Sequence, residues 1–310
     1  MYGIDFHADD YAASIGNSKR ILELLRAGRI DSLSVITNMG CYEECMKLLR
    51  DNWDLFPKKP LLSVHINLID GYRLSSPESG EIINNSWAKI FICGLPFVRK
   101  KGSLRSDFTT EIEAQIRAFL KGTENLRDEN GNRVALRIDS HVHTHMIPLV
   151  FQAVEDALER MGLLHQVSFI RCSTEPLFMF LFTPGVAGTV SPVNILKNLT
   201  LHFFSHFVRN RLRSLGIETG RIFGLAMTGE MDLKRVSLLM PKMKEFAQKK
   251  NAYLEVLSHP GRVDREEISE EYGPDDRTVF ISPRRDVEFR MLMEIRREGD
   301  SSAHKAGGEG

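Results

Sequence analysis

Short apolar runs alternate with helix-like segments along most of this chain, and that alternation restricts the fold more than any other feature. Strands are expected at residues 2–6, 33–36, 61–66, 134–138, 167–171, 222–226 and 253–257. Apolar residues at helical spacing predict helices at 16–27, 42–49, 109–120 and 151–161. This alternation predicts a parallel sheet or barrel with crossover helices. A length of 310 residues suits one α/β barrel domain.

Two long segments interrupt the pattern, and the end of the chain departs from it. Residues 70–108 read as a loop or a small helical excursion, and 176–215 as an apolar, aromatic stretch followed by a basic helix. In that helix Arg209, Arg211 and Arg213 are expected to form a solvated face. Residues 1–298 are predicted to be a single domain, and the polar, glycine-rich segment 299–310 a disordered tail.

Charge and composition narrow the classes of partner. Lys+Arg and Asp+Glu both number 41, so net charge gives no support for a nucleic-acid or membrane partner. No secretory signal and no run of transmembrane length is recognised, so a cytoplasmic location is expected. The spacing of the four cysteines fits neither a zinc ribbon nor a redox pair. Reduced, packed thiols are the better interpretation, although Cys41 and Cys45 could share a helical face as a thiolate pair.

Acidic and imidazole side chains follow several predicted strands. Asp9 and Asp10 follow the first, His65 ends the third, and His259 follows the last. In α/β barrels the active site forms at these strand ends. A few oxygen and nitrogen ligands with a spare carboxylate have the composition of an open hydrolytic metal site.

The adjacent carboxylates of Asp9 and Asp10 allow two interpretations. Like charges close together raise one carboxylate pKa unless a cation lies between them. A divalent metal would resolve that conflict, with one Asp as its ligand and the other as a base. Alternatively, Asp10 merely caps the following helix.

Three alternating histidines, His141, His143 and His145, follow Asp139 and the fourth predicted strand. On an extended strand all three would project to one face. Same-face neighbours are about 7 Å apart, whereas a metal ion binds its ligands at about 2 Å. One or two metal ligands from this cluster are therefore expected, and the remaining histidines would support the ligands or contact substrate.

The motifs taken together resemble the YdjC-like carbohydrate deacetylases, the chitooligosaccharide deacetylase family. The resemblance is carried by His7-Ala8-Asp9-Asp10-Tyr11, by Val64-His65-Ile66-Asn67-Leu68, by Asp139-Ser140-His141-Val142-His143-Thr144-His145, by Phe223-Gly224 with Ser258-His259-Pro260-Gly261, and by the closing Arg285-Asp286-Val287-Glu288. These motifs occur in the family's order between residue 4 and about residue 295.

This resemblance implies a deformed (β/α) TIM-like barrel, related in architecture to polysaccharide deacetylases. It implies metal-dependent removal of an N-acetyl group from a sugar, with Asp10, His65 and His141 as ligands of one divalent metal ion, magnesium or zinc. Asp9 would be the general base, and His259 would act near the leaving amine. His7, Asp139, His143, His145 and Arg171 are expected to support the ligands or contact the substrate.

Departures from the family pattern leave the substrate open. His7 stands where the family usually has Asn, Tyr11-Ala12 replaces Phe-Gly, and Asp31 replaces Thr. Another barrel metallohydrolase, such as a phosphoesterase or an amidohydrolase, and a non-catalytic sugar-binding protein remain alternatives. The aromatic residues Trp87, Phe91 and Phe97 and those at 178–182 and 203–207 are either sugar platforms or, more simply, core or homodimer contacts.

Overall fold

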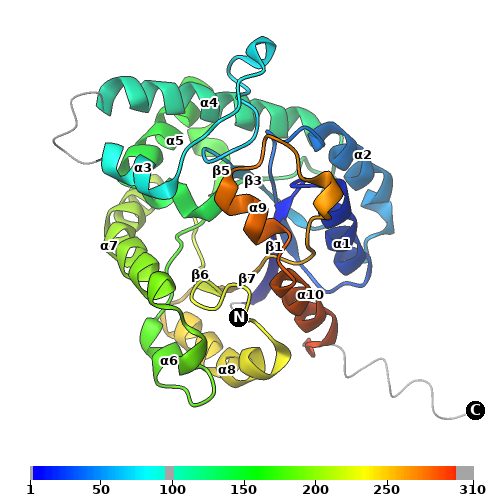
Figure 1. Ribbon diagram of the computed structural model, residues 1–310, viewed down its shortest axis with the longest axis vertical. Coiled ribbons are helices and arrows are strands. Elements are labelled where there is room, and N and C mark those ends of the chain that lie inside the picture. The colour runs from blue at the N-terminus through cyan, green and yellow to red at the C-terminus, as the bar shows by residue number, and fades with distance from the viewer. Residues whose placement is uncertain (1–2, 95–100, 298–310) are drawn as a thin grey trace, which may run out of the picture.

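A computed structural model describes residues 3–94 and 101–297 of the chain. Within these residues seven parallel strands form one sheet in the order β5-β4-β3-β2-β1-β7-β6. The sheet curls, helices surround it, and α9 crosses in front of the strands (Figure 1). The α/β class and the deformed-barrel architecture expected from the sequence are confirmed. The expected tail at 299–310, the residue Phe97 and the start of the first predicted strand lie outside the described residues.

The strands coincide with the seven predicted apolar runs. Their bounds are β1 Ile4–Tyr11, β2 Ser32–Val35, β3 Leu61–Ile66, β4 Leu136–Ser140, β5 Val167–Ile170, β6 Arg221–Phe223 and β7 Leu254–Ser258.

The α-helices include all four that were predicted, and α4 and α5 begin earlier than expected. Their bounds are α1 Ile15–Arg26, α2 Tyr42–Asn52, α3 Trp87–Cys93, α4 Lys101–Gly122, α5 Pro148–Arg160, α6 Leu177–Leu181, α7 Pro192–Leu215, α8 Leu233–Lys249, α9 Pro274–Phe280 and α10 Arg284–Glu294. None of the helices in the described parts of the chain is long and apolar enough to cross a membrane.

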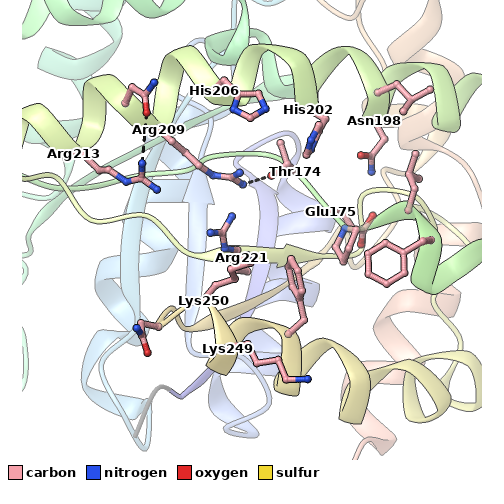
Figure 2. A pocket seen from close by; sticks show the side chains of 17 residues that line it. Thr174, Glu175, Asn198, His202, His206, Arg209, Arg213, Arg221, Lys249 and Lys250 are labelled. Carbon is pink, nitrogen blue, oxygen red and sulfur yellow. Dashed lines mark hydrogen bonds between the residues drawn. The ribbon is translucent and has the colours of Figure 1, made fainter.

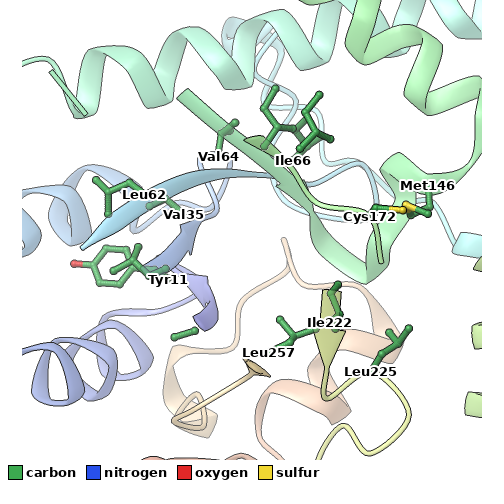
Figure 3. Close-up of a cluster of buried hydrophobic side chains, with 14 of the residues drawn as sticks. Tyr11, Val35, Leu62, Val64, Ile66, Met146, Cys172, Ile222, Leu225 and Leu257 are labelled. Carbon is green, nitrogen blue, oxygen red and sulfur yellow. The ribbon is translucent and has the colours of Figure 1, made fainter. Parts of the chain in front are cut away.

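Alternation along β2 separates an apolar outer face from a polar interior. On β2, Leu33 and Val35 join the buried apolar core, whereas Ser32 and Ser34 form hydrogen bonds with polar groups inside the barrel. Figure 3 shows part of this apolar layer, including Val35 and Val64. The hydrophobic effect therefore packs the helices against the outside of the sheet, and the interior is left to charged and hydroxyl groups.

The sheet is nearly open between its two edge strands. Where β5 approaches β6, the described pairing is limited to an isolated bridge between Phe169 and Glu218 and the hydrogen bond from Ile170 N to Glu218 O. Helix α7 belongs to the segment that connects the two edges. Ser191 caps its N-terminus, Pro192 occupies its first turn, and Gly216 ends it with a φ of 70°.

Gly224, just after β6, occupies a backbone position that only glycine fits without strain. Its φ is 132°, and a Cβ atom there would lie 2.3 Å from the carbonyl oxygen of Leu257. Its N–H donates to a Glu175 carboxylate oxygen. The geometry of this turn thus holds two strand ends and Glu175 together.

We predict that Gly224→Ala lowers the free energy of unfolding by about 2–4 kcal/mol, because it adds backbone strain and a steric clash. Gly188→Ala is the matched control: Gly188 has no positive φ and no atom within 4 Å of an added Cβ. Urea denaturation of both variants checks the prediction. Equal stability of the two variants would contradict it.

Candidate metal centre

The two carboxylates of β1 both face the interior because the strand ends in an unusual conformation. Asp9 and Asp10 were expected to follow the first strand, but they belong to the end of β1. In an extended strand their side chains would point to opposite faces. Asp10, however, has a φ of 67° and Ala12 a φ of 69°, a region that non-glycine residues rarely adopt. This turn leaves both carboxylates buried, with Asp9 against Arg171 and Asp10 against Arg285.

Asp10, His65 and His141 converge on one point. Asp10 Oδ1 lies 3.4 Å from His65 Nε2 and 3.2 Å from His141 Nδ1. All three side chains are buried, and one ligand atom from each lies within 4.8 Å of the others. His65 Nε2 has no hydrogen-bond partner. A buried, unpartnered imidazole nitrogen beside a carboxylate and a second imidazole fits a divalent metal ion, with one oxygen and two nitrogen ligands.

His65 is held by the carboxylate of Asp139. Its Nδ1 lies 2.6 Å from Asp139 Oδ1, and the two residues pair directly across β3 and β4. A carboxylate that accepts the far N–H of an imidazole fixes both the ring orientation and the tautomer, as is common for metal-binding histidines. Asp139 therefore aims His65 Nε2 at Asp10.

The charges around this cluster favour a cation. Burial alone would lower the pKa of His65, but the carboxylates of Asp9, Asp139 and Asp10 outweigh it and raise that pKa to about 9. Burial is likewise outweighed at His141, where Asp276 and Asp10 raise the pKa well above its usual value. The groups that hold protons on these imidazoles would equally hold a metal ion in their place.

A second group, His7, Asp9 and Asp139, already contains a positive charge. The Arg171 guanidinium lies 2.9 Å from Asp9 Oδ1 and 3.1 Å from Asp139 Oδ2. His7 Nε2 lies 3.0 Å from Asp9 Oδ1, and both His7 nitrogens contact serine hydroxyls of β2. Because guanidinium and hydroxyl groups satisfy these carboxylates, the Asp10 cluster is the better candidate for a metal.

Asp9 is thereby kept ionised. Burial would raise the pKa of Asp9, but Arg171, His65 and His7 together lower it well below its usual value. Its Oδ2 also lies 3.8 Å from His259 Nε2. Asp9 therefore stands between the interior guanidinium and a partly exposed imidazole.

His259 is positioned by the closing helix α10. Glu288 accepts a hydrogen bond from the backbone N–H of His259, and its Oε2 lies 3.6 Å from His259 Nδ1. On the same helix Arg285 donates to Asp10 Oδ2 at 2.9 Å. These two contacts give a physical reason for the Arg-x-x-Glu motif that the sequence resemblance singled out.

The three alternating histidines do not lie on a strand. β4 ends at Ser140, and His141–Met146 form a 3₁₀ turn in which Val142 and His143 have positive φ. The expectation that all three would share one face if extended therefore does not apply. His141 reaches Asp10, His143 Nδ1 contacts Ser173, and His145 contacts Ser140 and the carbonyl of Arg171.

Two further residues at the site were not predicted from the sequence. Asp276 of α9 lies 3.2 Å from His141 Nε2 through its Oδ1. Lys197 of α7 lies close enough to this carboxylate to feel its charge, although burial dominates and lowers the pKa of Lys197 to about 8. Asp276 follows Gly273-Pro274, a context that indicates only a helix start, and Lys197 falls in a segment without a recognised motif.

The aromatic residues of the 70–108 segment mainly pack together. The rings of Trp87 and Phe91 stack with centroids 5.4 Å apart, and Phe91 also contacts Phe204 of α7 at 5.8 Å. The core-contact interpretation fits these two residues better than a sugar platform.

Comparison with known proteins identifies the family of this chain. The profile of the YdjC-like protein family matches residues 4–296, nearly the whole described chain. The chain belongs to the YdjC-like family. A carbohydrate deacetylase from Geobacillus stearothermophilus is 28% identical over 162 residues, which cover 51% of this chain and 56% of that relative. The match thus spans only a little over half the length of the relative.

A solved structure supports the fold of this YdjC-like chain. A protein from Enterococcus faecalis V583, described there as a proposed cellobiose-phosphate cleavage protein, superposes with a TM-score of 0.58. The two share 14% sequence identity, and the alignment covers 94% of this chain and 90% of the other. At that identity the similarity shows a shared fold.

We predict that Arg171→Met lowers the free energy of unfolding by about 3–5 kcal/mol, because it leaves buried carboxylates without their cation. Arg160→Met removes an exposed arginine that pairs with Glu113 and should change stability by no more than about 0.5 kcal/mol. Urea denaturation compares the two variants. A loss below about 1 kcal/mol for Arg171→Met would show that the interior charges do not depend on it.

Proposed function

We propose that this YdjC-like protein is a metal-dependent hydrolase that removes the N-acetyl group from an amino sugar or a short oligosaccharide. The observation that carries the proposal is the unpartnered His65 Nε2 beside Asp10 and His141. The carbohydrate deacetylase from Geobacillus stearothermophilus supports the reaction class. Acetate and a free amino sugar would be the products.

Asp10, His65 and His141 would hold the metal ion. Once bound, a divalent ion would polarise a carbonyl group and would lower the pKa of water, which makes hydroxide available as a nucleophile at neutral pH. An Asp and two His suit several divalent metals, and magnesium and zinc are the two that we propose.

Asp9 and His259 would handle the protons. Asp9 is proposed as the general base because it is ionised and its Oδ2 faces His259, although the charge of Arg171 lowers its pKa and so weakens it as a base. His259 is proposed to donate a proton to the departing amine, or to position it, since it is partly exposed and 3.8 Å from Asp9. Glu288 would hold His259 in place through its backbone N–H.

The cytoplasmic location and the homodimeric state of the protein are also proposed. Among the described residues all four cysteines are free, which is compatible with a reducing cytoplasm. A homodimer is proposed because Val193, Leu196 and Phe203 of α7 are 73%, 67% and 75% exposed, and clustered exposed apolar groups mark interaction surfaces. Sedimentation velocity checks the assembly, and a monomer at working concentration would exclude the homodimer.

The proposed activity is tested by acetate release. Protein stripped of metal and reloaded with Zn²⁺, Mg²⁺, Mn²⁺ or Co²⁺ is incubated with N-acetylated chitooligosaccharides and nucleotide-linked N-acetyl sugars. We expect metal-dependent acetate release, and we expect Asp9→Asn to lower kcat at least about 100-fold while retaining the metal. Asp10→Asn should lose the metal itself, because it removes a ligand.

Asp51→Asn on α2 is the matched control, since within the described part of the chain Asp51 pairs with the exposed Lys47 alone. It should retain full activity. Near-full turnover by metal-loaded Asp9→Asn would refute the base assignment. Phosphate release from generic esters without acetate release would favour a phosphoesterase, and sugar binding without any product would favour a non-catalytic protein.

A further inference from the structure

A cavity of about 720 Å³ lies away from the metal-site residues, on the outer side of the sheet. It is bounded by α7, by the chain that follows β5, by β6 and by the end of α8 (Figure 2). None of Asp9, Asp10, His65, His141 or His259 lines it. Its size is within the range of small-molecule sites.

Three arginines meet at one end of this cavity. Arg209 and Arg213 are one helical turn apart on α7 and share a face, and Arg221 reaches the cavity from β6. Arg211, between the first two in sequence, instead pairs with Glu155. The expectation that this helix face is simply solvated is therefore incomplete, because Arg209 and Arg213 line a cavity.

These three guanidinium groups have no carboxylate partner among the described residues. Arg209 donates to the hydroxyls of Thr174 and Ser205, and Arg213 donates to Asn210. Arg221 lies over the ring of Phe246, 6.0 Å from its centroid. The Nε atoms of Arg209 and Arg221 are buried without any hydrogen-bond partner. Partly buried donors without a hydrogen-bond partner, beside like charges without a counter-ion, are unfavourable.

The three arginines also repel one another at this end of the cavity. Burial, together with the charges of Arg209 and Arg213, lowers the pKa of Arg221 to about 10. Lys250 also lines this part of the cavity. A bound anion would relieve both the repulsion and the missing hydrogen bonds.

The carboxylate in the cavity does not serve as that anion. Glu175 lies toward the opposite end in Figure 2, and its two oxygens accept hydrogen bonds from the backbone N–H groups of Gly224 and Ala226. Burial raises the pKa of Glu175 to about 7, even though these N–H groups oppose the rise. Phe178 and Leu177 line the cavity as well. The arrangement suits a ligand with an anionic group at one end and an uncharged body.

We propose that this cavity binds a small molecule that carries a phosphate group, held among Arg209, Arg213 and Arg221. Guanidinium forks match the oxygens of phosphate in pairs, and a phosphate dianion offsets more of a threefold positive charge than a carboxylate does. The concave shape and the neutral net charge of the chain favour a small molecule over a nucleic acid. This binding site is independent of the proposed deacetylase activity.

Isothermal titration calorimetry of the full-length protein with inorganic phosphate and with pyrophosphate tests the proposal. The protein is stripped of metal with a chelator, and Asp10→Asn is titrated in parallel, so that phosphate held by a metal ion does not contribute. We expect binding at millimolar ligand or below in both proteins. Arg221→Gln and Arg213→Gln should each weaken it about tenfold or more, since each removes charged hydrogen bonds.

Arg211→Gln is the matched control, from the same helix, and should bind as the unmodified protein does. Arg213 is exposed, so Arg213→Gln keeps the test valid if Arg221→Gln fails to fold. The proposal is overturned if neither phosphate nor pyrophosphate binds, or if both arginine variants bind as tightly as the control. Tighter binding of citrate than of pyrophosphate would overturn the assignment to phosphate.

Discussion

The arrangement of charges inside this barrel depends on the ion pairs of the Arg171 guanidinium group. Among the described residues Arg171 is the largest fully buried side chain, and it forms ion pairs with Asp9, Asp139 and Glu255, which come from β1, β4 and β7. Each carboxylate is buried, so each would be costly without the shared cation. Through Asp139 the same cation also supports the orientation of His65. The site and the barrel interior are therefore one electrostatic unit.

Beside these ion pairs, the site is formed by strand ends with unusual backbone conformations and by helices α9 and α10. Asp10 and His143 adopt positive φ, and such conformations persist where the surrounding structure determines them. Arg285 donates a hydrogen bond to Asp10, and the Asp276 carboxylate contacts the His141 imidazole. Helices α9 and α10 therefore complete a site whose proposed ligands come from the first half of the chain. Formation of this site thus requires contacts between the two ends of the described chain.

Local patterns predicted the sheet well because strand alternation and helical spacing are properties of neighbouring residues. The same patterns placed Asp10, His65 and the histidine cluster at strand ends, which meet at one edge of a parallel sheet. The choice of Asp10, His65 and His141 as proposed metal ligands came from the family resemblance. They failed for the histidine cluster, where the 3₁₀ turn depends on tertiary contacts of His143 and His145. They also missed Asp276, and they treated Arg209 and Arg213 as surface charges, because a single sequence does not show which distant segments come together.

The near-open seam between β5 and β6 is bridged by a segment that differs in role from the strands that carry the proposed metal ligands. The groups proposed to hold a metal ion belong to β1, β3 and the turn after β4, and none of them belongs to the two strands that border the seam. The 176–215 segment, by contrast, connects the two edges with little strand pairing to preserve. Its sequence and length can therefore change without breaking the hydrogen-bonded ladder. A barrel built in this way can acquire new surfaces for ligands or partners on the connecting segment without a change in the strands that carry its proposed metal ligands.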